Sequence, residues 1–349
     1  LALVPDTPAI LNNLGNVHRE LGDLETAVLQ YRRAIELAPS YAEALSNLAS
    51  AELARGAFDV AIGLLERAVS IEPGNGTALA TLGRALLQSG RPADAEAAYR
   101  QAVAAAPQLA EAHAGLADTL VQRGEAEGAV QSFSAALAIR PGFSAARSGL
   151  VFMRNYLGGD DALSISREAR AFGESLARPA APRVHRNDPR PGRRLAIGLV
   201  SGDFRSHAVA TFLSGVLPEI DREAFRLHAY ATSPHRDVVT ERFRQTMEGW
   251  CDASGLDDKS LAERIETDRI DILTDLSGHT MFNRLPVFAL KPAPVQMSWL
   301  GYSGTTGVKE IDYVLGDNMV TPPREEDQLV EAPWRMPDSY LCWTPPAAD

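Results

Sequence analysis

Two absences narrow the class of this protein: the sequence has little cysteine and no long apolar run. Only Cys251 and Cys342 occur in 349 residues, too few for the disulfide framework of a small secreted domain. No stretch reaches the roughly 20 consecutive apolar residues of a membrane-spanning helix, and the N-terminus lacks the pattern of a signal peptide. Together these absences predict a cytoplasmic protein without a membrane partner.

Basic residues are also fewer than acidic ones. The 34 Lys and Arg residues are outnumbered by 45 Asp and Glu residues, which leaves a net charge of −11. Binding to nucleic acid needs a basic surface, so we exclude nucleic acid as a partner. The sequence also lacks CxxC pairs, an HxxxH helix, a GxxxxGKS/T phosphate loop and a GxGxxG dinucleotide motif. We therefore predict no metal and no bound cofactor.

A fixed spacing organises the first part of the chain. Alanine recurs every 34 residues at Ala27, Ala61, Ala95 and Ala129, and proline recurs with the same spacing at Pro39, Pro73, Pro107 and Pro141. Four residues after each alanine comes a large side chain: Tyr31, Leu65, Tyr99 and Phe133. This is the tetratricopeptide repeat pattern, in which small residues let two antiparallel helices approach and proline ends the second helix. We predict four helical hairpins over residues 8–143, stacked in a right-handed superhelix, and a divergent cap at 144–156, so that the array occupies residues 1–156.

Asparagines in the first two repeats are candidates for binding a peptide. Asn13 and Asn47 occupy the same position in successive repeats, on helices that line the inner face of such a superhelix. An asparagine amide can both donate to and accept from a peptide backbone, whatever side chains the peptide carries. The alternative is that they are solvated polar positions. Thr81 and Gly115 stand at the corresponding positions of the later repeats, so any asparagine ladder is partial.

A connecting segment, residues 157–194, separates the array from the rest of the chain. Residues 162–177 are predicted to form a helix, whereas residues 177–194 are rich in proline and arginine and lack apolar periodicity. That composition is typical of an extended linker. We expect its arginines to be solvated rather than part of a site.

The last part, residues 195–349, alternates short apolar strands with helices. Strands are predicted at residues 195–200, 226–231, 271–276, 294–300 and 313–316. Such strands pair in parallel through right-handed crossovers, so we predict a Rossmann-like layered domain. Its polar, glycine-containing loops at residues 201–207, 277–280 and 301–307 should meet at one edge, where sheets of this kind bind ligands.

Asp203 and His207 lie in the first of these loops. An imidazole can accept a proton near neutral pH, and a carboxylate four residues earlier could orient the ring. The alternative is structural: Asp203 would cap the helix that follows, and His207 would be a satisfied polar residue.

Three segments carry a family resemblance: SGDFRSHAV at residues 201–209, DLSGHT at 275–280 and ALKPAPVQMSWLGYSGTTG at 289–307. Together with the repeats, they make the chain resemble the tetratricopeptide-repeat O-linked N-acetylglucosamine transferases in their bacterial, Spindly-type form. The resemblance implies an α plus α/β chain, in which a repeat superhelix is followed by the N-terminal Rossmann-like half of a GT-B glycosyltransferase.

The same resemblance implies an activity and a set of site residues. Members of the family transfer N-acetylglucosamine from UDP-N-acetylglucosamine to Ser or Thr of proteins, with inversion and without a metal. The nucleotide-sugar is a donor substrate rather than a cofactor, and the repeat array would hold the protein or peptide acceptor. Asp203 and His207 match the family's catalytic motif. The sugar pocket is matched by Leu300, Gly301, Tyr302 and Ser303, and His279 belongs either to this pocket or to a structural hydrogen bond.

The sequence departs from the family in two positions and in extent. Ser303 stands where the family usually has proline, and Ala169 stands where many bacterial relatives have histidine, in a stretch like EHRAFGE. The family's second Rossmann-like half does not follow before Asp349, so we expect this chain alone to be inactive. Two alternatives stay open: a protein O-fucosyltransferase that uses GDP-fucose, and a non-catalytic repeat scaffold with a vestigial α/β domain.

Overall fold

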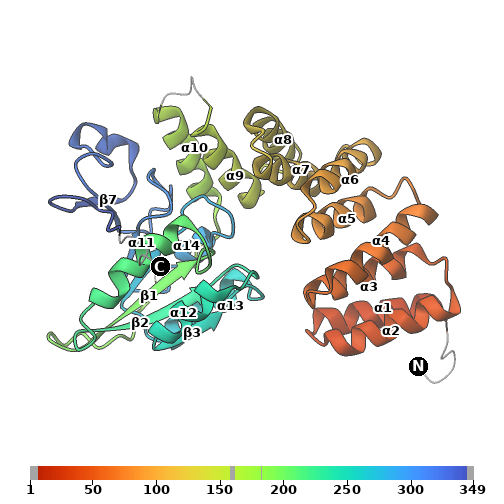
Figure 1. The fold of residues 1–349 in the computed structure, drawn as a ribbon, viewed down its shortest axis with the longest axis horizontal. Helices are drawn as coiled ribbons and strands as arrows, with labels where there is room; N and C mark the ends of the chain where they lie inside the picture. Colours follow the sequence, from red (N-terminus) through yellow and green to blue (C-terminus); the bar gives the residue numbers. More distant parts are fainter. Residues whose placement is uncertain (1–6, 158–161, 182, 344–349) are drawn as a thin grey trace, which may run out of the picture. The chain divides into compact units, whose positions relative to one another are not determined.

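The computed structural model describes residues 7–157, 162–181 and 183–343, and the chain divides into two compact units, Leu1–Ala146 and Arg147–Asp349 (Figure 1). Each unit has its own clusters of buried apolar side chains. Within the described ranges, no helix combines the length and the apolar character needed to cross a lipid bilayer.

Consecutive helical hairpins make up the described part of the first unit. Their helices are α1 (Pro8–Glu20), α2 (Leu24–Leu37), α3 (Ala42–Ala54), α4 (Phe58–Ile71), α5 (Gly76–Gln88), α6 (Pro92–Ala105), α7 (Ala110–Gln122) and α8 (Ala126–Ile139). The second helix of each hairpin ends two residues before one of the repeated prolines, because the residue before proline is disfavoured in helical conformation. The four predicted hairpins are confirmed.

The turn inside each hairpin depends on a glycine that the predicted pattern did not include. Gly22, Gly56, Gly90 and Gly124 have φ values of 81°, 77°, 78° and 76°. This left-handed conformation ends an α-helix, and glycine adopts it without steric cost. These glycines share the 34-residue spacing, so they are a second sequence mark of the same repeat.

The repeated alanines lie where the sequence pattern requires contact between helices. Ala27, Ala61, Ala95 and Ala129 are each 0% exposed. The large side chains four residues later, Tyr31, Leu65, Tyr99 and Phe133, are also buried. Small and large side chains therefore alternate along the contact, which fills it without voids.

Enlarging one of these alanines should overpack the contact. In α6, Ala95 is buried and Ala97 is exposed, which offers a matched pair on one helix. Ala95→Leu should destabilise the repeat unit by about 1–3 kcal/mol, whereas Ala97→Leu should be nearly neutral. Far-UV circular dichroism during thermal unfolding measures both, and equal melting temperatures would contradict the role assigned to Ala95.

Two helices open the second unit. They are α9 (Ser144–Arg154) and α10 (Ala162–Ser175). The division between the units falls after Ala146, so α9 is counted with the second unit from Arg147 onward. The sequence had placed residues 144–156 at the end of the repeat array. Side chains of α9 have partners in the second unit, where Ser148 contacts His279 and Arg147 pairs with Glu168.

A parallel sheet forms the centre of the second unit. Its strands are β1 (Leu195–Ser201), β2 (Phe225–Ala231), β3 (Gly249–Asp252), β4 (Ile272–Asp275), β5 (Val295–Ser298), β6 (Tyr313–Gly316) and β7 (Ala332–Arg335). They are ordered β3-β2-β1-β4-β5-β6-β7, with every pair parallel. The sequence had not predicted β3 and β7. Both are four-residue edge strands, and pairing with the neighbouring strand, rather than an apolar run of their own, fixes them.

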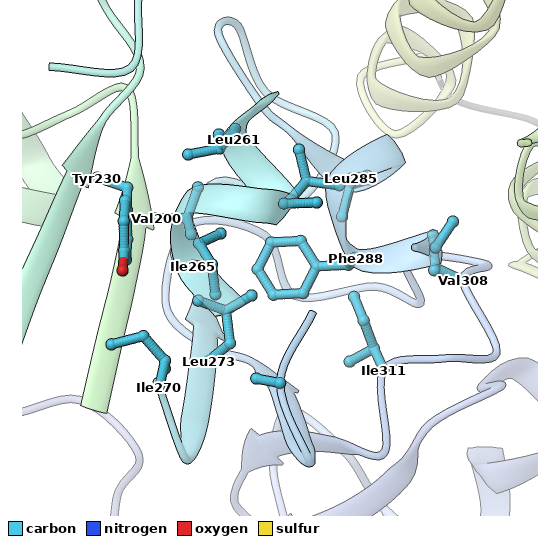
Figure 2. Close-up of a cluster of buried hydrophobic side chains, with 14 of the residues drawn as sticks. Val200, Tyr230, Leu261, Ile265, Ile270, Leu273, Leu285, Phe288, Val308 and Ile311 are labelled. Atoms are coloured by element: carbon cyan, nitrogen blue, oxygen red, sulfur yellow. The ribbon is translucent and has the colours of Figure 1, made fainter. Parts of the chain in front are cut away.

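Helices cover both faces of this sheet. They are α11 (Ala208–Val216), α12 (Val238–Thr246), α13 (Asp258–Thr267) and α14 (Leu285–Ala289), with short 3₁₀ turns at Leu217–Glu219 and Pro323–Gln328. From β1 the chain adds β2 and β3 on one side, and then β4 and β5 on the other side. Because each crossover is right-handed, α11 and α12 lie on one face of the sheet and α13 and α14 on the other. One cluster of buried side chains includes those of α11 and α12, and another includes those of α13 and α14. Figure 2 shows the cluster on the α13 and α14 face, with the Phe288 ring of α14 at its centre, between Ile265 and Ile311.

The arginines of the connecting segment are not solvated as expected, because acidic side chains of the α/β unit hold several of them. Arg193 forms two bonds to Asp271, of 2.5 and 2.7 Å, and Arg178 lies 2.6 Å from Glu310. Arg183 pairs with Glu266. Burial raises the pKa of Asp271, but hydrogen bonds from Arg193, the Ala196 amide and Asn187 outweigh it and hold the pKa below its usual value. Composition suggested a free linker, whereas these ion pairs fasten it along the sheet.

Candidate functional site

The loops that follow β1, β4 and β5 pack against one another at the carboxyl edge of the sheet. β4 lies between β1 and β5, so the outer two are about 9.6 Å apart, two strand spacings. The Gly202 amide donates to Ser277 Oγ at 3.4 Å. A Cβ on Gly301 would lie 2.0 Å from the Leu276 carbonyl oxygen, so these two loops touch backbone to backbone. The topology therefore brings together loops that are separated by up to about a hundred residues of sequence.

Asp203 sits in this edge as a buried carboxylate between the guanidinium of Arg205 and the imidazole of His207. It is 4% exposed, and its oxygens lie 3.7 Å from Arg205 Nη2 and 3.6 Å from His207 Nδ1. Both distances exceed those of ordinary hydrogen bonds. Burial raises the pKa of Asp203, and the charges of His207 and Arg205 oppose this shift only in part.

His207 makes a contact that bears on its tautomer. Its Nδ1 accepts a bond from the Val209 amide at 3.3 Å, which caps α11. The helix cap is thus His207 and not Asp203, which the structural alternative had named. A neutral ring that accepts at Nδ1 carries its proton at Nε2, whereas donation from Nδ1 to Asp203 would free Nε2 to accept. Val209 and Asp203 therefore compete for Nδ1, and the outcome decides whether Nε2 donates or accepts.

His207 can be reached from outside. Its side chain is 38% exposed and borders a groove of about 360 Å³ between α11 and α12. Ala210 and Phe243 contribute apolar lining to this groove, and Arg242 contributes its one charged group. The ring therefore faces a concave surface that has room for part of a substrate.

Leu300 and Gly301 form a strained turn at the end of β5. Leu300 has φ 81°, and the Gly301 amide donates to the Trp299 carbonyl at 3.0 Å. A bond from residue i+2 to residue i around a positive φ defines a γ-turn, which is rare and costly for a branched side chain. Such strain persists only where the surroundings impose it, and it clusters at functional sites. Ser303, two residues further on, is exposed.

Tyr302 points inward from the same loop. Its hydroxyl accepts a bond of 3.0 Å from Asn155 Nδ2, and burial raises its pKa to about 12. The ring lies against Gly278, where an added Cβ would meet Tyr302 Cβ at 2.2 Å. Tyr302 thus connects the loop after β5 to the loop after β4 and to the end of α9.

His279 lies in the interior rather than on a pocket wall. It is 2% exposed, its Nδ1 is 2.9 Å from Ser148 Oγ, and its ring meets those of Phe172 and Tyr302 edge to face at 4.9 and 5.2 Å. Burial lowers its pKa to about 3, so the ring is neutral at physiological pH. Of its two proposed roles, the structural hydrogen bond is the one that these contacts describe.

Two buried carboxylates that support the loops were missed at the level of sequence. Asp275 is fully buried, accepts from the Gly278 amide at 2.8 Å and from Ser298 Oγ at 3.1 Å, and burial raises its pKa to about 6. Glu331 accepts from Thr305 Oγ1 at 2.7 Å and from the Thr306 amide at 2.8 Å. Asp275 is the first residue of the DLSGHT motif, and this position in the motif could have identified it from sequence. Glu331 is about 25 residues from its partners, and only the fold connects them.

The candidate asparagines of the repeat unit differ in their surroundings. Asn13 is exposed. Asn47 Nδ2 donates to Asn12 Oδ1 at 2.9 Å, and Asn12 in turn donates to Glu43 at 3.0 Å. Asn47 therefore has part of its amide committed to a neighbouring helix. Among the described residues, no group of three or more His, Cys, Asp or Glu side chains is placed to hold a metal ion.

Comparison with known proteins finds a family match in each unit. Residues 175–343 match the family model for Glycosyl transferase family 41, and tetratricopeptide repeat models match residues 5–76, 52–119 and 110–133. A solved structure of a mutant O-GlcNAc transferase from Thermobaculum terrenum superposes with a TM-score of 0.64 at 31% identity, covering 97% of this chain and 59% of that chain. The predicted fold class is confirmed.

Curated proteins are similar to this chain over less than half of its length. The chain is similar to the "Probable UDP-N-acetylglucosamine--peptide N-acetylglucosaminyltransferase SPINDLY" of Petunia hybrida, with 40% identity over 163 residues, 46% of this chain and 18% of that protein. It is also similar to the "Probable UDP-N-acetylglucosamine--peptide N-acetylglucosaminyltransferase SEC" of Arabidopsis thaliana, with 33% identity over 150 residues, 43% of this chain and 15% of that protein. The matched region thus spans less than a fifth of the length of either relative.

The buried His279 should make the second unit sensitive to acid. Its pKa of about 3 in the folded state lies below the ordinary 6.5, so the unfolded chain binds the proton more readily between these values, and stability falls as the pH falls through this window. Between pH 7.5 and 5.0 this amounts to about 2 kcal/mol. His279→Gln removes the titration and should lessen the loss by that amount.

Tryptophan fluorescence during urea unfolding isolates this effect, because all four tryptophans lie in the second unit. His113→Gln, in the repeat unit, is the control and should retain the wild-type pH dependence. An identical pH dependence for His279→Gln and wild type would show that His279 does not stay neutral in the folded state.

Proposed function

Because residues 175–343 match the family model for Glycosyl transferase family 41, we propose that this chain carries the first Rossmann-like half of a protein O-glycosyltransferase. The proposed reaction transfers N-acetylglucosamine from UDP-N-acetylglucosamine to Ser or Thr side chains of protein acceptors. The observation that carries the proposal is the position of the Asp203–His207 pair. It lies next to the reversal of strand order between β1 and β4, at the edge where doubly wound sheets bind nucleotide ligands.

The proposed reaction needs a group that takes a proton from the acceptor. The Ser or Thr oxygen attacks C1 of the sugar, the bond from C1 to the diphosphate oxygen breaks, UDP leaves and the configuration inverts. His207 Nε2 takes the hydroxyl proton once Nδ1–H donates to Asp203. The present 3.6 Å between Nδ1 and the carboxylate is long for that bond, and catalytic hydrogen bonds commonly tighten when substrate binds.

The turn at Leu300–Gly301 is proposed to receive the sugar. Its strained backbone lies beside the loop after β4, close to the edge that carries Asp203. Ser303, exposed at the tip of the loop, would complete this pocket in place of the proline that is usual in the family. A second Rossmann-like half would supply most contacts to the nucleotide, so residues 1–349 by themselves would turn over poorly.

The repeat unit is proposed to hold the acceptor polypeptide. Asn13 offers an exposed amide, and Asn47 retains a free amide oxygen lone pair beyond its bond to Asn12. Backbone recognition by such amides would accept many sequences, as an enzyme that modifies several proteins requires.

The donor can be tested directly in the full natural protein that carries this segment. With an acceptor protein present, UDP-N-acetylglucosamine should yield a product whose mass increases by one N-acetylhexosamine, and chelation of divalent metals by EDTA should leave the rate unchanged. A deoxyhexose added from GDP-fucose would instead establish the fucosyltransferase. No transfer from either donor would favour the scaffold.

His207→Ala should lower turnover far more than donor affinity. General-base help acts mainly in the transition state, so kcat should fall by about 10²–10⁴-fold while the dissociation constant of the donor changes little. His185→Ala, a histidine of the connecting segment, is the control and should keep both values. An unchanged kcat in His207→Ala would remove the histidine from the mechanism.

A further inference from the structure

One helix reaches two of the three loops at the candidate site. Ser148 of α9 contacts His279 in the loop after β4, and Asn155, directly after α9, contacts Tyr302 in the loop after β5. The two contacts are seven residues apart, which is about two helical turns and returns to the same face of a helix. The segment 148–155 therefore fastens both loops from one side.

The contact at Ser148 is a relay of three side chains. Asn283 Nδ2 donates to Ser148 Oγ at 3.1 Å, and Ser148 Oγ lies 2.9 Å from His279 Nδ1. Because the hydroxyl accepts from Asn283, its own proton is available to His279, whose neutral ring accepts it. Ser148 and His279 are both buried, so this contact is sheltered from water.

The contact at Asn155 involves backbone as well as side chain. Asn155 Nδ2 donates to the Val151 carbonyl at 2.8 Å and to the Tyr302 hydroxyl at 3.0 Å. The first bond fixes the amide at the end of α9, so the second holds Tyr302 to a rigid element. Tyr302 is also confined by Gly278 beneath its ring.

Tyr302 is two residues from the centre of the strained turn. Leu300 at φ 81° costs on the order of 1–3 kcal/mol unless its surroundings enforce this conformation. Gly301 is held against Leu276 on one side, and the next side chain along the chain is Tyr302. A fixed Tyr302 therefore limits how far the Leu300–Gly301 backbone can relax.

We propose that Asn155 and Tyr302 are a positioning pair that holds the Leu300–Gly301 turn in its strained conformation. Tyr302 would act on the sugar pocket through the backbone of its own loop, because Asn155 holds its hydroxyl in place. The role assigned to the turn in catalysis rests on the proposed function, whereas the restraint of the turn does not.

Two variants remove the contact without removing the ring or the helix. Tyr302→Phe deletes the hydroxyl, and Asn155→Ala deletes the amide. The matched control is Tyr230→Phe, which loses a buried tyrosine hydroxyl bonded to Asp268 at 2.9 Å on another part of the sheet. All three variants, and the double variant of the pair, are made in the full natural protein.

The first measurement is amide hydrogen exchange by mass spectrometry over residues 299–304. The Asn155–Tyr302 bond is exposed to solvent, so its loss is worth about two- to fivefold in a local equilibrium, and each variant of the pair should exchange faster there by about that factor. The double variant should exchange no faster than the singles, since the two groups make a single contact. The Tyr230→Phe control should leave these residues unchanged. Wild-type exchange at residues 299–304 in both variants of the pair would overturn the proposal.

The second measurement is steady-state transfer. Both variants of the pair should lower kcat by several-fold with little change in the KM of the acceptor, while Tyr230→Phe keeps wild-type kcat even if its melting temperature falls. Faster exchange combined with an unaltered kcat would overturn the pair's role in the reaction. If the wild type transfers no sugar but the exchange result holds, the pair does restrain the turn and the proposed function is what fails.

Discussion

The reversal of strand order between β1 and β4 is the constraint on which the candidate site depends. β1 is followed by α11 on one face of the sheet, and β4 is followed by α14 on the other face. The chain therefore leaves these two neighbouring strands towards opposite faces, and the carboxyl edge at this point is where doubly wound sheets bind ligands. Asp203 follows one of these strands and Ser277 the other, which is why residues so distant in sequence share an edge.

Two buried carboxylates at this edge, Asp275 and Glu331, are held by several hydrogen bonds each. Asp275 accepts from backbone amides and Ser298, and Glu331 accepts from Thr305 and Thr306. A buried carboxylate without such partners would cost several kcal/mol. These two groups set the conformation of the loops and have little capacity left for substrate.

Asp203 differs from the other buried carboxylates. Its neighbours Arg205 and His207 stay beyond hydrogen-bond distance, and burial raises its pKa. The turn at Leu300 is also locally unfavourable, because a branched side chain there has a positive φ. Natural proteins tolerate such departures mainly where function requires them, and here both occur at one edge of one sheet.

The sequence by itself determined the repeat unit almost completely, because each hairpin depends on contacts between residues close in the chain. Residues equivalent to Ala95, Tyr99 and Pro107 recur every 34 positions, so the same contacts between neighbouring helices form in every hairpin. It also determined the order of strands and helices in the α/β unit and the motifs that contain Asp203, His207 and Leu300. The edge strands β3 and β7 escaped prediction because pairing, not pattern, defines them.

Only the tertiary structure decided what several of the site residues do. The sequence left His279 open between the pocket and a structural hydrogen bond, and it is the contacts with α9 and α10 that cover the ring. Nothing in the sequence indicated that Asn155 contacts Tyr302. Glu331 and the paired arginines of residues 177–194 had no sequence mark, because their partners lie far along the chain. Local pattern reports which residues a loop contains. Burial and hydrogen bonding across the fold decide which of them face a substrate and which hold the others in place, since those interactions join residues that no spacing relates.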